Sequence, residues 1–114
     1  DWMARWFFTG GIMPSDDLLL HFQRDLAVVD HWRVDGRHYQ RTAAAWRHNL
    51  EARRARVLNI LGAHYGARQR RVWFNRWKLF FLACEELFAH AGGTEWGLGH
   101  SRLAKASARL EAAR

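Results

Sequence analysis

Residues 36–61 read GRHYQRTAAAWRHNLEARRARVLNIL, and this stretch decides the fold that we expect for the chain. Its apolar residues recur at steps of three, four or seven, the spacing that places side chains on one side of an α-helix. We therefore predict one long helix over 36–61, with an apolar stripe facing a core and arginines over the remaining surface. The stripe consists of Tyr39, Ala43, Trp46, Leu50, Val57 and Leu61.

The first turn of this helix has a composition that suits an anion. Gly36 can release the chain from an extended segment, and Arg37, His38 and Tyr39 follow it directly. The first N–H groups of a helix lack partners inside the helix, so a cation and a phenol beside them favour a small bound anion. The spacing is equally explained if Tyr39 is simply a core residue of an amphipathic helix.

A second long helix is predicted over 67–91, ARQRRVWFNRWKLFFLACEELFAHA, after a turn bracketed by Gly62 and Gly66. Gly92 and Gly93 end it, because glycine readily takes the backbone conformation that follows a helix. A turn this short predicts that the two long helices are antiparallel neighbours. The apolar side of the second helix carries Trp73, Trp77, Phe80 or Phe81, Cys84 and Phe88.

Two strands are predicted, one on each side of the helical pair. Residues 26–34, LAVVDHWRV, follow a short helix predicted over 16–24 with Ser15 as its N-cap. Residues 94–103, TEWGLGHSRL, alternate weakly, and the tail beyond them favours helix by composition. Two strands alone make a marginal sheet, and open edges invite pairing with another chain. The sequence therefore predicts part of a larger α/β unit.

The composition is that of one globular domain. The 114 residues are 49% hydrophobic and 25% charged, and no uncharged apolar stretch is long enough to span a bilayer. The start lacks the features of a secretory signal, and the single cysteine, Cys84, cannot form an internal disulfide, so a cytoplasmic setting is expected. A formal charge of +7 favours anionic partners such as phospholipid headgroups, nucleic acid or an acidic protein.

The seven histidines show no HxxxH, HExxH or cysteine-rich spacing, so we expect no metal site. Cys84 lies on the apolar side of a helix, which favours a buried, inert thiol over a nucleophile. The sequence contains no P-loop and no GxGxxG, so we assign no cofactor-binding residues to this chain.

Arginines and aromatic residues alternate at the start of the second long helix. This pattern is typical of a nucleic-acid or membrane-surface stripe, in which cations hold phosphates while rings stack or insert. A helix with an aromatic core face and a basic back has the same spacing and is favoured over nucleic-acid binding. Membrane contact stays open because the rings are large. The residues are Arg68, Arg70, Arg71, Arg76 and Lys78 with Trp73, Phe74 and Trp77.

Four segments in order resemble the C-terminal part of the cyclopropane-fatty-acyl-phospholipid synthase family. They are TGGIMPS, DHWRVDGRHYQRTAAAW, NRWKLFFLAC and GGTEWGLGHSRL, and they correspond in this order to that family's Pro-Gly-Gly-x-L-P-S, H-Y-x-x-T-x-x-x-W and L-x-x-C segments over about residues 2–103. Thr9 stands where the family has proline. The resemblance implies the C-terminal third of a class I methyltransferase-like (Rossmann-like) α/β fold, mainly helical, as a single partial domain over 1–114.

The resemblance also implies an activity and a site. The family transfers a methyl(ene) group from S-adenosylmethionine to the double bond of an unsaturated phospholipid acyl chain, with bicarbonate as the base. Tyr39 matches the tyrosine that contacts bicarbonate, and apolar residues of the two long helices would wall the acyl pocket: Trp46, Trp77, Phe80, Phe81 and Cys84. The chain would lie at the inner face of the cytoplasmic membrane.

The family's cofactor loop and its other bicarbonate ligands lie upstream of anything that matches this chain. We therefore expect that the chain alone binds no cofactor and is inactive, and that an upstream methyltransferase chain or a homo-oligomer completes it. The alternative is a non-enzymatic basic aromatic module that binds an anionic membrane or a partner protein. Nucleic acid is the less favoured partner.

Overall fold

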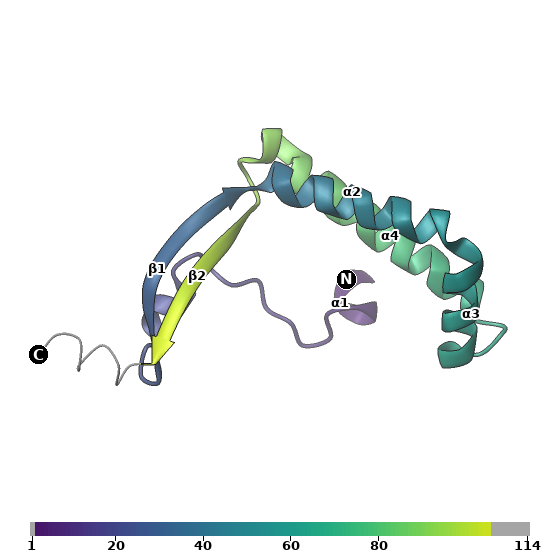
Figure 1. The fold of residues 1–114 in the computed structure, drawn as a ribbon, viewed down its shortest axis with the longest axis horizontal. Helices are drawn as coiled ribbons and strands as arrows, with labels where there is room; N and C mark the ends of the chain where they lie inside the picture. The colour runs from purple at the N-terminus through teal and green to yellow at the C-terminus, as the bar shows by residue number, and fades with distance from the viewer. Residues whose placement is uncertain (1, 106–114) are drawn as a thin grey trace, which may run out of the picture. The chain divides into compact units, whose positions relative to one another are not determined.

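The computed structural model describes residues 2–105, and these form two compact parts that are taken in turn. Residues 35–98 make up the helical part, and residues 2–34 with 99–105 make up the part that holds most of the two strands. Figure 1 shows the elements in order. They are α1 (Trp2–Trp6), η1 (Leu18–His21), β1 (Leu26–Asp35), α2 (Gly36–Ala52), α3 (Arg54–Tyr65), α4 (Arg70–Ala89), η2 (His90–Gly93) and β2 (Gly97–Lys105).

The helical part is built on α2 and α4, which lie side by side and run in opposite directions (Figure 1). Their apolar stripes face each other, so the predicted antiparallel pair of long helices is confirmed. Ala43 of α2 is fully buried and gives α4 room to approach closely. Its partners in the core are Leu61, Phe74, Phe80 and Cys84, of which Phe74 is the most buried large side chain at 1% exposure.

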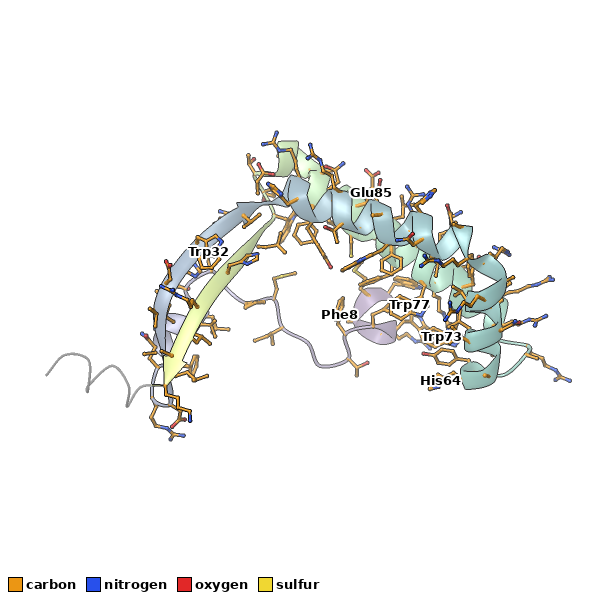
Figure 2. All side chains as sticks on the ribbon, viewed as in Figure 1. Phe8, Trp32, His64, Trp73, Trp77 and Glu85 are labelled. Carbon is orange, nitrogen blue, oxygen red and sulfur yellow. The ribbon has the colours of Figure 1, made fainter. Side chains whose placement is uncertain are left out.

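Ion pairs tie the two helices together on the side away from the rings. The guanidinium Nε of Arg47 donates to Oε2 of Glu85 at 3.0 Å, and Nζ of Lys78 lies 2.6 Å from Oε1 of Glu51. Glu85 is mostly covered, so its pairing with Arg47 is worth more than that of a fully solvated pair. Figure 2 shows Glu85 and Trp77 on opposite sides of the helical pair.

The predicted single helix over 36–61 is wrong in one respect, because it breaks at Arg53. There φ is −106° and ψ is 27°, and the N–H of Arg53 is shared between the carbonyls of Asn49 and Glu51. The bend starts a new helix, α3, whose Leu61 is buried and whose Arg54 guanidinium lies over the Phe74 ring. After the break, α3 therefore packs against α4.

A close backbone crossing joins the start of α2 to the end of α4. A Cβ on Gly36 would meet the carbonyl oxygen of Trp96 and would lie 2.6 Å from that of Phe88. Gly93 has a φ of 82°, and a Cβ there would lie 2.8 Å from the backbone nitrogen of Arg37. Gly36 is therefore needed for close approach, besides releasing the chain from the strand. The second long helix ends slightly earlier than predicted, since α4 ends at Ala89 and η2 follows.

The strands β1 and β2 form a two-stranded antiparallel sheet. Cross-strand contacts fix its register: the ring of Trp32 stacks on that of His100 with centroids 5.4 Å apart, and the carboxylate of Asp30 pairs with Arg102 at 3.6 Å. β1 agrees with the prediction. β2 begins three residues later than predicted, because Thr94 is held in a turn by a bond from its hydroxyl to the carbonyl of Ala91.

The prediction of a helix over 16–24 with Ser15 as N-cap is wrong. Only one 3-10 turn forms, Leu18–His21, and its N-cap is Asp17, whose side chain makes no capping bond. A helix this short is not stable without an apolar face to bury, and Leu19, Leu20 and Phe22 are all exposed. The sequence pattern also gave no sign of α1. The predicted helical tail lies outside the described residues beyond Lys105, while Ala104 and Lys105 belong to β2.

Candidate functional site

Tyr39 lies in the first turn of α2 and points at the last turns of α4. Its ring meets the Phe88 ring edge-on, with centroids 4.6 Å apart and an interplanar angle of 89°. It meets the Trp46 ring in the same way at 5.8 Å and 86°. Burial, and secondarily the nearby thiol of Cys84, raise the pKa of Tyr39 above its ordinary value. The phenol therefore stays protonated at neutral pH and can donate a hydrogen bond.

The rings continue as an unbroken row along the two helices. Trp46 is in contact with Phe81 at 5.8 Å between centroids, and Phe81 is in contact with Trp77 at 5.7 Å. Trp77 in turn meets Phe80 nearly at a right angle at 5.8 Å. We call this set the aromatic row: Tyr39, Phe88, Trp46, Phe81, Trp77 and Phe80.

The predicted pocket residues divide by burial. Phe80 and Cys84 are buried, with 8% and 7% exposure, so they pack the helices together. Trp46 is 44% exposed, and Trp77 and Phe81 are partly exposed, so these three rings can reach a ligand. Burial also raises the pKa of the Cys84 thiol, as expected for an unreactive cysteine. The structure brings the predicted residues together and adds Phe88, which the sequence placed on the same apolar side but not in the site.

The start of α2 differs from the open anion site that the sequence predicts. The N–H of Arg37, which we expected to be free, donates to the carboxylate of Asp35 at 2.7 Å. The Arg37 guanidinium donates to the same carboxylate at 2.8 and 3.1 Å. These bonds lower the pKa of Asp35 and neutralise the cation that an anion would need. An internal carboxylate thus occupies this helix start, and the bicarbonate contact of Tyr39 stays a prediction.

A polar chain in the strand-bearing part was not predicted. His31 of β1 places Nδ1 3.0 Å from the hydroxyl of Ser101 on β2 and Nε2 3.3 Å from the carboxylate of Asp16. These contacts of His31 hold the segment before η1 against the sheet. Asp16, His31 and Ser101 are far apart in the sequence and occur in no motif, so the sequence could not predict that they meet.

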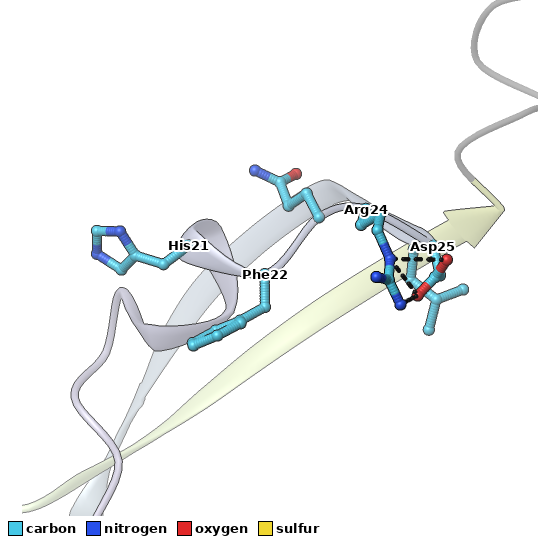
Figure 3. Close-up of a pocket in the computed structure, with 6 residues that line it drawn as sticks. His21, Phe22, Arg24 and Asp25 are labelled. Atoms are coloured by element: carbon cyan, nitrogen blue, oxygen red, sulfur yellow. Dashed lines mark hydrogen bonds and ion pairs between the residues drawn. The ribbon is translucent and has the colours of Figure 1, made fainter.

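A hollow of about 550 Å³ lies at the segment that enters β1 (Figure 3). It is lined by residues 21–26, all of them exposed, and the Arg24 guanidinium pairs with Asp25 at its rim. Nothing buried or convergent faces it, so we assign it no function. Among residues 2–105, no group of three or more His, Cys, Asp or Glu could hold a metal ion. None of the helices described there is both long and apolar enough to cross a bilayer.

The sequence of this chain is similar to those of plant N-methyltransferases. An (S)-coclaurine N-methyltransferase from Thalictrum flavum subsp. glaucum is 32% identical over 104 residues, which is 88% of this chain and 29% of that protein. A pavine N-methyltransferase from the same plant is 31% identical over 101 residues, 86% of this chain and 28% of that protein. The chain thus spans less than a third of the length of these curated relatives. No protein-family model matches it.

A solved structure agrees in three dimensions. The crystal structure of coclaurine N-methyltransferase bound to N-methylheliamine and SAH matches 82% of this chain and 28% of that chain, with a TM-score of 0.69 and 32% identity. The predicted α/β fold, mainly helical with two long antiparallel helices and two strands, is confirmed. The relatives are N-methyltransferases, so the resemblance is supported at the level of a methyltransferase and not of cyclopropane synthases in particular. The chain has the fold of the C-terminal part of a methyltransferase.

Proposed function

We propose that the chain is the C-terminal portion of an S-adenosylmethionine-dependent methyltransferase and that its aromatic row lines the methyl-acceptor pocket. The match to a structure bound to SAH carries the proposal, because SAH is what S-adenosylmethionine becomes once its methyl group has been transferred. The chain has no glycine-rich nucleotide loop of its own. The residues that hold the methyl donor would therefore come from outside this sequence.

An amine nitrogen is the acceptor that the relatives favour. In such a reaction the nitrogen lone pair forms the new N–C bond, the S–C bond of the sulfonium breaks, and its electron pair stays on sulfur. A secondary amine then releases a proton to a base, whereas a tertiary amine becomes a quaternary cation. The faces of Trp46, Phe81 and Trp77 suit this reaction, because positive charge develops on the nitrogen as the N–C bond forms, and aromatic rings attract cations.

The double bond of an unsaturated acyl chain is the second candidate acceptor. The order His38, Tyr39, Thr42 and Trp46 in the H-Y-x-x-T-x-x-x-W pattern supports it, as does the apolar character of the aromatic row. Tyr39 would then hold the bicarbonate that removes the proton as the ring closes. Because its phenol stays protonated, it would donate to the anion and not accept the proton itself.

The sheet favours a role as part of a larger catalyst. A two-stranded sheet is marginal, and among the described residues neither β1 nor β2 has a further strand beside it. An upstream methyltransferase segment, or a second copy of the chain, would pair with one of these edges. We therefore expect turnover only when the chain is completed in this way.

A labelling experiment tests the proposal. The chain is expressed alone and together with the reading frame encoded immediately upstream, and each preparation receives methyl-labelled S-adenosylmethionine with either a benzylic amine or unsaturated phospholipid vesicles. We expect label in the amine, and only in the completed preparation. Label in the acyl chain would support the second acceptor. Transfer by the isolated chain would refute the claim that it is a portion of the catalyst, and no label in either acceptor would refute methyl transfer.

A further inference from the structure

Positive charge gathers at the end of the helical part where α3 meets the start of α4. Between Ala52 and Cys84 the sequence contains no Asp and no Glu. We call the surface formed by the seven arginines of this stretch the arginine end. They are Arg53, Arg54, Arg56, Arg68, Arg70, Arg71 and Arg76.

Two of these arginines are held against rings, and others reach solvent. The Arg54 guanidinium lies 4.5 Å from the centroid of Phe74, and that of Arg76 lies 4.8 Å from the centroid of Trp73. These contacts fix the surface on which the remaining charges stand. The exposed members are Arg53, Arg54, Arg56, Arg68 and Arg71.

Exposed aliphatic side chains stand among the charges. Ile60 on α3 is 59% exposed, and Val72 in the first turn of α4 is 42% exposed. Aliphatic groups surrounded by guanidinium groups fit the boundary of a lipid bilayer, where cations meet phosphates and short apolar chains enter below them. A purely electrostatic surface would have no need of them.

The rings at this end are already engaged, which weighs against nucleic acid. Trp73 stacks on Tyr65, with centroids 3.9 Å apart and planes at 14°. Phe74 is 1% exposed beneath Arg54. Binding of single-stranded nucleic acid relies on open ring faces on which bases stack. These rings instead stiffen the end of the hairpin.

We propose that the arginine end docks on the surface of an anionic phospholipid bilayer. The exposed guanidinium groups contact lipid phosphates, and Ile60 and Val72 enter the headgroup region. The docking needs neither the methyl donor nor an acceptor, so it is independent of the proposed methyl transfer and can be tested on the chain as it stands.

The test is cosedimentation of the full chain with vesicles of phosphatidylcholine, with and without phosphatidylserine. The test variant is Arg56→Glu with Arg71→Glu, and the control is Arg24→Glu with Arg41→Glu. Both pairs change exposed arginines, and both lower the net charge by four. A second variant, Ile60→Ser with Val72→Ser, keeps the charge and removes the apolar groups. Circular dichroism confirms that each protein is folded.

We expect binding to the anionic vesicles that falls as salt is added, and a loss of at least about tenfold in the Arg56/Arg71 variant. The control should bind within about threefold of the parent, and the Ile60/Val72 variant should bind more weakly than the control. Equal loss in the control and test variants would show charge attraction without a site and would overturn the proposal. So would equal binding to both vesicle types, or a labelled oligonucleotide that displaces the vesicles at equimolar phosphate.

Discussion

The rings of Tyr39 and Phe88 meet edge-on, with centroids 4.6 Å apart, at the point where the first turn of α2 crosses the last turns of α4. Tyr39, the residue to which the sequence assigns a chemical role, thus also takes part in the packing of α2 against α4. The ring of Tyr39 therefore stabilises the fold, whereas its hydroxyl takes no part in these ring contacts. Phenylalanine at this position keeps the first and removes the second.

Tyr39→Phe should lower methyl transfer to an unsaturated acyl chain by the completed enzyme at least about tenfold, because the lost hydrogen bond to bicarbonate costs about 1.5–3 kcal/mol. The affinity for S-adenosylmethionine should change little, since Tyr39 is assigned to the acceptor side. Steady-state kinetics and calorimetry measure the two quantities separately. Unchanged turnover would leave Tyr39 with a packing role only.

Trp46→Ala should raise the KM for the methyl acceptor about tenfold, as the loss of a cation–π contact and of apolar area would do. Trp46 is 44% exposed, so the fold should survive the change. Trp32→Ala is the matched control, because Trp32 is 47% exposed and stacks on His100 of the sheet. A KM that rises equally in both variants would contradict a role of the aromatic row in acceptor binding.

Gly36→Ala should destabilise the chain by about 1–3 kcal/mol, because its Cβ would press on the backbone carbonyls of Trp96 and Phe88, which cannot rotate away. Gly62→Ala is the control. Its Cβ would lie 3.5 Å from Cδ of Arg70, an ordinary contact, and glycine inside a helix costs up to about 1 kcal/mol relative to alanine. Urea unfolding should therefore give opposite signs for the two variants. Equal stability of Gly36→Ala and the parent would refute the close crossing.

Stability should fall in acid through Asp35 and Glu51. Hydrogen bonds from Arg37 and Lys78 lower the pKa of these carboxyls below their ordinary values of 3.8 and 4.5. The unfolded chain then binds protons at a higher pH than the folded chain, so the stabilisation is complete above the ordinary values and disappears as pH drops through the lowered ones. Melting temperatures between about pH 6 and about pH 2 should show this fall.

Asp35→Asn with Glu51→Gln should flatten that pH dependence, since the amides do not titrate in this range. Asp25→Asn is the control, because it replaces an exposed carboxylate that pairs with the exposed Arg24. An undiminished slope in the double variant would show that other carboxyls dominate.

The sequence predicted the helical pair, the two strands and the apolar sides, because these depend on local periodicity and on glycines at turns. It missed the break at Arg53, where no proline or glycine marks the change and after which α3 packs against α4. It predicted an open anion site at the start of α2 because it could not show that the side chain of Asp35 folds back onto Arg37.

The other features that the sequence did not predict depend on contacts between distant segments. The sequence predicted most of the aromatic row, because helical spacing places its residues on facing stripes of the two helices. It gave no sign of the chain formed by Asp16, His31 and Ser101, because that chain depends on strand register and on a loop without regular structure. The helix predicted over 16–24 did not form, because its apolar residues Leu19, Leu20 and Phe22 have no core to cover.

The most direct test of the central claim is the binding of SAH measured by isothermal titration calorimetry, with the chain alone and with the chain completed by its upstream segment. A portion that supplies the acceptor wall should release no binding heat by itself and should contribute to a single saturable site when it is completed. Stoichiometric binding of SAH by the isolated chain, or no binding by the completed assembly, would contradict the account.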